Sequence, residues 1–120
     1  MKKIKFIGLF LCFLTISNVY AAEHQVKMLT SNAGKSMVFE PPVLQIKAGD
    51  TVRWLNAEPG HNSVSIDEMI PAGGSTWIGE VNEEIVVKFD TEGVYGYKCV
   101  PHYVLGMVGL IVVGDASNNL

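Results

Sequence analysis

Short runs of alternating apolar and polar residues cover most of the chain after its first 21 positions. From Glu84 to Asp90, for example, Ile85, Val87 and Phe89 fall on one face of an extended strand, and Glu84, Lys88 and Asp90 fall on the other. This period of two is typical of a half-buried antiparallel strand. The pattern predicts eight such strands, over Gln25–Leu29, Met37–Glu40, Val43–Lys47, Thr51–Leu55, Ser63–Ile66, Glu84–Asp90, Val94–Lys98 and Val108–Val113.

Turn-forming residues separate these runs. Ala48-Gly49-Asp50 and Thr91-Glu92-Gly93 each lie between two of them, and Pro41-Pro42 suits a sheet edge or a crossing between sheets. The segment Asp67–Thr76 reads as a loop with room for one helical turn. About eight short strands in about a hundred residues predict an all-β fold, a Greek-key β-sandwich.

The first 21 residues have a different character. Lys2, Lys3 and Lys5 precede an apolar run from Phe6 to Ile16, and small residues at Val19 and Ala21 suit a cut after Ala21. This is the pattern of a secretory signal peptide, so we expect export, to the periplasm, of one domain of residues 22–120. The alternatives fit less well. The run is too short for a membrane anchor, and a lipoprotein cut at Cys12 would fall inside it.

Charge and cysteine content change once that segment is removed. The 120-residue chain has 9 Lys and Arg against 12 Asp and Glu; without Lys2, Lys3 and Lys5 the balance is 6 − 12 = −6. An acidic chain without basic runs argues against nucleic acid as a partner. Cys99 remains as a single thiol, which in an oxidising compartment needs burial or a bonding partner.

The candidate chemistry surrounds that thiol. Cys99, His102 and Met107 follow one another as Cys-x2-His-x4-Met on a loop between two predicted strands. A thiolate, a thioether and imidazole together select copper, and the blue-copper arrangement needs a second histidine. His61 follows a predicted strand and reaches the same end of a sandwich, whereas His24 lies near the processed start and is the weaker candidate. Asn62 is expected to support His61 through a hydrogen bond.

Taken with several further stretches, this loop resembles the cupredoxins, the blue copper proteins, and among them the pseudoazurins. The stretches are Met37-Val38-Phe39-Glu40-Pro41, Ala48-Gly49-Asp50-Thr51-Val52, Gly60-His61-Asn62, Met69-Ile70-Pro71, Gly93-Val94-Tyr95-Gly96, Lys98-Cys99-Val100-Pro101-His102-Tyr103, Gly106-Met107-Val108-Gly109 and Val113-Gly114-Asp115. The resemblance implies a cupredoxin-like fold and one copper ion held by His61, Cys99, His102 and Met107. It also implies that His102 is the exposed ligand through which electrons pass, and that Met37 packs near it.

The chain departs from the pseudoazurin pattern at three points. It has no helical tail after the last strand and is amicyanin-like in length. Only Lys98 fits the usual lysine ring of the docking face, and Val100 stands where a hydroxyl residue often follows the cysteine.

The expected function is that of an exported, monomeric carrier of single electrons, not an enzyme. By resemblance its transient partners include nitrite reductase, amine dehydrogenase or c-type cytochromes, and no membrane contact is expected after cleavage. The main alternative is a copper-binding protein for delivery or storage, although no Met- and His-rich tract is present. A zinc site, or a sandwich interaction module in which these residues are ordinary core or surface groups, is the remaining alternative.

Overall fold

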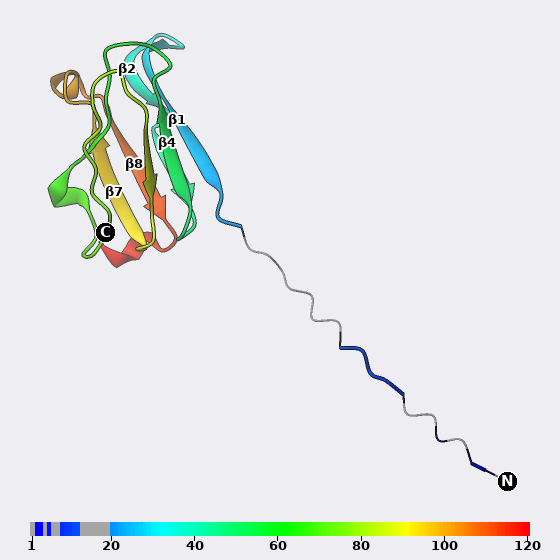
Figure 1. Ribbon diagram of the computed structural model, residues 1–120. Coiled ribbons are helices and arrows are strands. Elements are labelled where there is room, and N and C mark those ends of the chain that lie inside the picture. The colour runs from blue at the N-terminus through cyan, green and yellow to red at the C-terminus, as the bar shows by residue number, and fades with distance from the viewer. Residues whose placement is uncertain (1, 4, 6–7, 13–19) are drawn as a thin grey trace.

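Two four-stranded sheets pack face to face in the computed structural model, which describes residues 2–3, 5, 8–12 and 20–120 (Figure 1). The first sheet has the order β2-β1-β4-β6, with bounds Lys35–Glu40, Glu23–Asn32, Thr51–Leu55 and Ile85–Lys88. The second has the order β3-β8-β7-β5, with bounds Val43–Ile46, Val108–Val113, Gly93–Lys98 and Val64–Ser65. The predicted all-β sandwich is confirmed.

Strand pairing departs from the antiparallel expectation in two places. β1 pairs with β4 in parallel, and β3 pairs with β8 in parallel, while the other pairings between these strands are antiparallel. Periodicity reports which face of a strand is buried, but it does not report the direction of the neighbouring strand. β1 is longer than predicted because its first half, Glu23 to Lys27, pairs with β4 and its second half, Lys27 to Asn32, pairs with β2.

The connections follow the expected turn residues. Pro41-Pro42 lies between β2 and β3, the edge strands of the two sheets, so it marks the crossing that the sequence predicted. The segment predicted as a loop with a helical turn contains the 3-10 helix η1 (Asp67–Met69). Two further 3-10 helices are present, η2 (Tyr103–Leu105) before β8 and η3 (Ala116–Asn118) after it.

Aromatic side chains fill the space between the sheets. Trp54 and Trp77 are stacked with ring centroids 5.1 Å apart, and Tyr97 meets Trp54 edge-on at the same distance. Burial of such large apolar surfaces is the main driving force for folding. Trp54, Trp77 and Met28 are all buried in this core, whereas Met69 is 42% exposed on η1.

The two ends of the sandwich are chemically distinct. The loop carrying η2 lies at one end, and β1 begins at the other (Figure 1).

Within residues 2–3, 5, 8–12 and 20–120, no helix has the length and apolar character needed to cross a membrane. The predicted signal peptide, residues 1–21, lies in part outside the described residues.

Candidate metal centre

The Cys99–Met107 loop joins β7 to β8 and is closed by its own backbone. The N–H of Cys99 donates to the carbonyl of Met107 at 3.0 Å, so the two sulfur-bearing residues are paired at the ends of neighbouring strands. The N–H of Met107 donates to the carbonyl of His102 at 3.2 Å. Gly106 ends η2 with a φ of 82°, a left-handed conformation that a side chain rarely adopts. These bonds fix the spacing of the loop.

His61 comes from the connection between β4 and β5, and Asn62 holds this connection to the cysteine loop. The side-chain oxygen of Asn62 accepts a hydrogen bond from the N–H of Val100 at 2.8 Å. Its amide nitrogen donates to the carbonyl of Gly79 at 3.1 Å. Asn62 thus joins the two loops that carry the candidate ligands, and it supports the site through the residue after Cys99.

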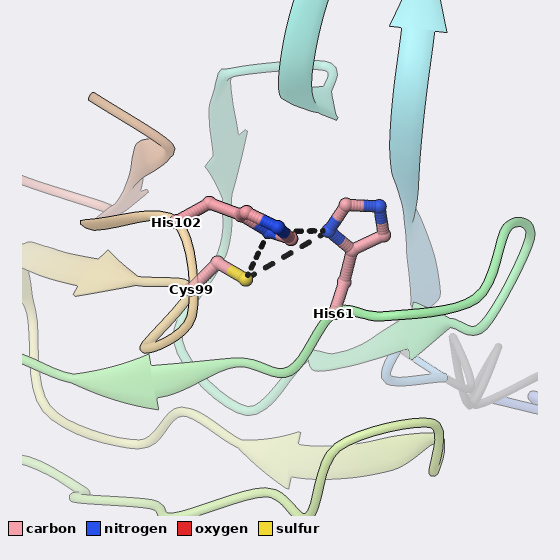
Figure 2. Close-up of side chains that lie close together, drawn as sticks. All are labelled: His61, Cys99 and His102. Carbon is pink, nitrogen blue, oxygen red and sulfur yellow. Dashed lines mark hydrogen bonds between the residues drawn. The ribbon is translucent and has the colours of Figure 1, made fainter. Parts of the chain in front are cut away.

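Three donor atoms converge at this end of the sandwich (Figure 2). The Nδ1 atoms of His61 and His102 are 3.1 Å apart, and the Sγ of Cys99 lies 3.5 Å from His102 Nδ1 and 3.8 Å from His61 Nδ1. All three donor atoms lie within 4.8 Å of one another. Both imidazole rings therefore present the same kind of nitrogen to one sulfur.

Burial differs between the two histidines. His61 and Cys99 have no exposed surface, whereas His102 is partly exposed. Burial lowers the pKa of His61, and the neighbouring His102 lowers it further, although Glu58 acts in the opposite direction. A lowered pKa keeps the imidazole neutral and its Nδ1 lone pair available to a metal.

Thr30 is the residue at the site that the sequence did not reveal. Its hydroxyl on β1 lies 3.0 Å from His61 Nε2, on the side of the ring away from Cys99. When Nδ1 presents its lone pair to the cluster, Nε2 carries the proton and donates it to the Thr30 hydroxyl. With Nε2 as the donor, this contact holds the ring orientation of His61.

Met107 and His24 are the remaining candidate ligands from the sequence. Met107 is fully buried at the end of the same loop, in backbone contact with both Cys99 and His102. His24 lies elsewhere: its Nε2 is 2.9 Å from the carboxylate of Asp50. His24 is therefore separate from the cluster.

The donor set at this site fits copper. Two imidazoles and a buried thiol, with a buried thioether on the same loop, are the soft and borderline donors that copper prefers. Carboxylates are absent from the cluster among the described residues, which argues against hard cations such as Mg²⁺ or Ca²⁺.

Comparisons with known proteins agree with this chemistry. Residues 26–114 match the copper-binding proteins of the plastocyanin/azurin family. Pseudoazurin from Methylorubrum extorquens is 50% identical over 100 residues, which cover 83% of this chain and 68% of that protein. Pseudoazurin from Paracoccus pantotrophus is 39% identical over 101 residues, or 84% of this chain and 70% of that protein.

A solved structure extends the comparison to the fold. The crystal structure of pseudoazurin from Hyphomicrobium denitrificans superimposes with a TM-score of 0.76 at 40% identity, covering 80% of this chain and 78% of that one. The chain therefore belongs to the plastocyanin/azurin family of copper-binding proteins, the cupredoxins, and is an electron carrier rather than an enzyme.

Proposed function

We propose that His61, Cys99, His102 and Met107 bind one copper ion, and that the chain carries single electrons between protein partners through it. The observation that carries this assignment is the convergence of His61 Nδ1, His102 Nδ1 and Cys99 Sγ within 4.8 Å. Copper bound there would supply a Cu(I)/Cu(II) couple. Thiolate and thioether donors favour Cu(I), and imidazole suits both oxidation states.

Electron transfer is fast when the ligand geometry changes little between the two oxidation states, and this chain holds its donors from several directions. Asn62 ties the His61 connection to the residue after Cys99, and Thr30 holds the far side of the His61 ring. The Cys99 and Met107 backbones are hydrogen-bonded to each other. These contacts restrain the ligand positions without taking a donor atom away from the metal.

His102 offers the route by which electrons would enter and leave. Its ring is partly exposed, while the donors Cys99 and His61 are buried. Val104 and Leu105, which follow it on η2, are 92% and 65% exposed. An apolar surface around an exposed ligand suits the small, short-lived interfaces of redox partners. By resemblance, nitrite reductase, amine dehydrogenase and c-type cytochromes are the proposed partner classes.

The proposed location is the periplasm. In this proposal residues 1–21 form a signal peptide, cleavage follows Ala21, and residues 22–120 form the single copper-binding domain. Support comes from the basic start, apolar run and small residues of that segment. The described β-sandwich begins at Glu23, directly after the proposed cut.

The test is to add Cu(II) to residues 22–120 and record visible absorption and electron paramagnetic resonance. The proposal expects an intense thiolate-to-copper absorption band and a narrow copper hyperfine pattern. Cys99→Ser should abolish the band. A pale, ordinary copper spectrum from the unmodified chain, or an intense band retained in Cys99→Ser, would overturn the ligand assignment.

The two histidines His61 and His24 provide a matched comparison. His61→Gln should disturb the absorption band, because it removes one of the three converging donors. His24→Gln should leave the band unchanged, because that ring contacts Asp50 instead. The reverse pattern would place the copper ion elsewhere.

A further inference from the structure

Asp50 is a buried carboxylate at the end of the sandwich where β1 begins, and the copper-site proposal does not use it. It is 6% exposed, and both of its oxygens are occupied. Oδ1 accepts a hydrogen bond from the N–H of Ala22 at 3.0 Å. Oδ2 lies 2.9 Å from His24 Nε2 and accepts from the N–H of Lys47 at 3.1 Å. Three separate points of the chain therefore converge on one side chain.

No permanent positive charge balances this carboxylate among the described residues. The ion pair found for Asp50 is with His24, which is charged only when protonated. Lys47 contributes its backbone N–H, and Lys88, opposite Thr51 on β6, pairs with Asp90 instead. The hydrogen bonds stabilise the carboxylate, and a permanent cation beside it would stabilise this buried charge further.

Ala22 is held at the place where such a cation can arise. Its N–H donates a hydrogen bond to Asp50 Oδ1, and its carbonyl accepts a hydrogen bond from the N–H of Thr51 at 3.0 Å. The preceding residues, Tyr20 and Ala21, are exposed. The bond between Ala21 and Ala22 is thus accessible, while the nitrogen that its hydrolysis would free already lies on a carboxylate oxygen.

We propose that Asp50 is the receptor for the α-ammonium group that processing creates at Ala22. The inference rests on the cleavage after Ala21 proposed above, and not on copper. Water adds across the Ala21–Ala22 peptide bond, Ala21 leaves with a new carboxylate, and the freed amine of Ala22 takes up a proton. The neutral amide donor thereby becomes a cation at the same position, so the ion pair stabilises the folded domain only after cleavage.

The experiment compares two forms of residues 22–120, one with a free amine at Ala22 and one with that amine acetylated. Acetylation keeps an N–H on Ala22 but removes its charge. We expect the acetylated form to have an unfolding equilibrium constant about tenfold larger in urea at pH 7, as for a partly buried, charge-assisted hydrogen bond. Equal stabilities would overturn the proposal.

Asp50→Asn completes a double-mutant cycle. The substitution should cost more stability in the free-amine form than in the acetylated form, because only the free-amine form has an ammonium that pairs with the carboxylate. Glu80→Gln, which alters an exposed acid with no side-chain hydrogen bond or ion pair among the described residues, serves as control and should cost the same in both forms. Equal costs of Asp50→Asn in the two forms would exclude the pairing.

A second readout covers the case in which Asp50→Asn fails to fold. In the free-amine form with Asp50 intact, proton titration followed by NMR should show the Ala22 amine with a pKa above the ordinary value of about 7.7–8.0. An ordinary or lowered pKa would contradict the ion pair. The copper absorption spectrum is recorded in parallel. The absence of the intense thiolate-to-copper band would count against the ligand assignment and not against this ion pair.

Discussion

Thr30 illustrates how a single hydroxyl can hold the orientation of a histidine ring at a cluster of donor atoms. Its Oγ1 lies 3.0 Å from His61 Nε2, while His61 Nδ1 faces Cys99 and His102. If Nε2 lost this partner, the buried ring would have an unpaired donor on one side and a freer torsion. When Nε2 carries the proton, the hydroxyl accepts it in a hydrogen bond and holds the ring so that Nδ1 is directed at Cys99 and His102.

Thr30→Val should weaken copper binding by roughly 10- to 100-fold, the usual cost of removing a hydrogen-bond partner of a metal ligand. The backbone N–H of Thr30, which donates to Glu58 at 3.1 Å, is unaffected by the change. Titration against a copper chelator measures the effect. Thr30→Ser keeps the hydroxyl and should retain most of the affinity, so equal losses in the two variants would contradict this role.

The sequence located the donor residues that the fold brings to one end of the sandwich more readily than the residues that hold them there. The spacing of Cys99, His102 and Met107 lies within one loop, so it could be recognised without a fold. Asn62 was expected to matter because it adjoins His61, although its bond to Val100 was not foreseen. Thr30 was missed because a threonine in a strand is ordinary, and only strand pairing shows that it reaches His61.

The folded domain should lose stability in acid as Asp50 becomes protonated. Hydrogen bonds from His24, Ala22 and Lys47 lower the pKa of Asp50 from 3.8 to about 2. A carboxyl whose pKa is lowered on folding contributes stability above its unfolded value, and this contribution is lost as the pH falls from about 4 through 2. Urea denaturation between pH 7 and 2 should show this decline, and Asp50→Asn should remove part of it. An identical pH profile in the variant would contradict the assignment.

Among the elements, β7 and β8 show how a glycine makes room for a core aromatic side chain. Gly109 on β8 lies opposite Tyr97 on β7. A Cβ at Gly109 would overlap the phenol ring of Tyr97, which Phe39 and Trp54 hold with centroids at 4.7 and 5.1 Å. The ring cannot move aside without disturbing the aromatic core, two residues from Cys99.

Gly109→Ala should therefore destabilise the domain by about 1–3 kcal/mol, the usual cost of overpacking. Gly96→Ala on β7 is the comparison and should cost less, because its Cβ would meet Met69, a 42% exposed residue whose Sδ and Cε can turn aside although its Cβ, 2.8 Å away, cannot. Urea denaturation of the apo domain measures both. A control as costly as Gly109→Ala would show that the rigidity of the Tyr97 ring is not the cause.

At the level of elements, sequence periodicity located the strands but not their neighbours. Alternation in Thr51–Leu55 and Val108–Val113 matches β4 and β8 to the residue, because each buries every second side chain. The predicted strand Ser63–Ile66 is reduced to Val64–Ser65, and beyond it the chain turns into η1. The parallel pairings of β1 with β4 and β3 with β8 depend on sheet-level packing that a local pattern does not encode.

For the molecule as a whole, the apolar surface of η2 is the proposed docking region. Leu105→Glu should slow electron transfer to a protein partner while leaving the copper spectrum intact, because the side chain is 65% exposed and lies three residues from His102. Stopped-flow kinetics with a c-type cytochrome measures the change. Val86→Glu, which alters a 45% exposed residue on β6, is the control. Unchanged rates for Leu105→Glu would remove η2 from the docking surface.

The net charge of the whole molecule should affect how fast the protein reacts with small charged redox reagents. The domain of residues 22–120 carries 6 basic and 12 acidic side chains, a balance of −6. Such a charge attracts cationic reagents and repels anionic ones over about 10 Å at 0.1 M salt. A positive charge nevertheless lies beside the loop that carries His102, since the ammonium of Lys98 is 4.9 Å from the ring centroid of Tyr103, the next residue.

Small charged redox reagents distinguish the effect of the net charge from the effect of Lys98. If the net charge dominates, reduction by hexaammineruthenium(II), a dipositive complex, should slow as salt rises from about 10 to 200 mM, while oxidation by hexacyanoferrate(III) should accelerate, because screening weakens attraction and repulsion alike. Lys98→Gln should then leave the sign of both salt dependences unchanged. If oxidation by hexacyanoferrate(III) instead slows with salt, and Lys98→Gln abolishes that trend, the potential at His102 is set by Lys98 and the prediction fails.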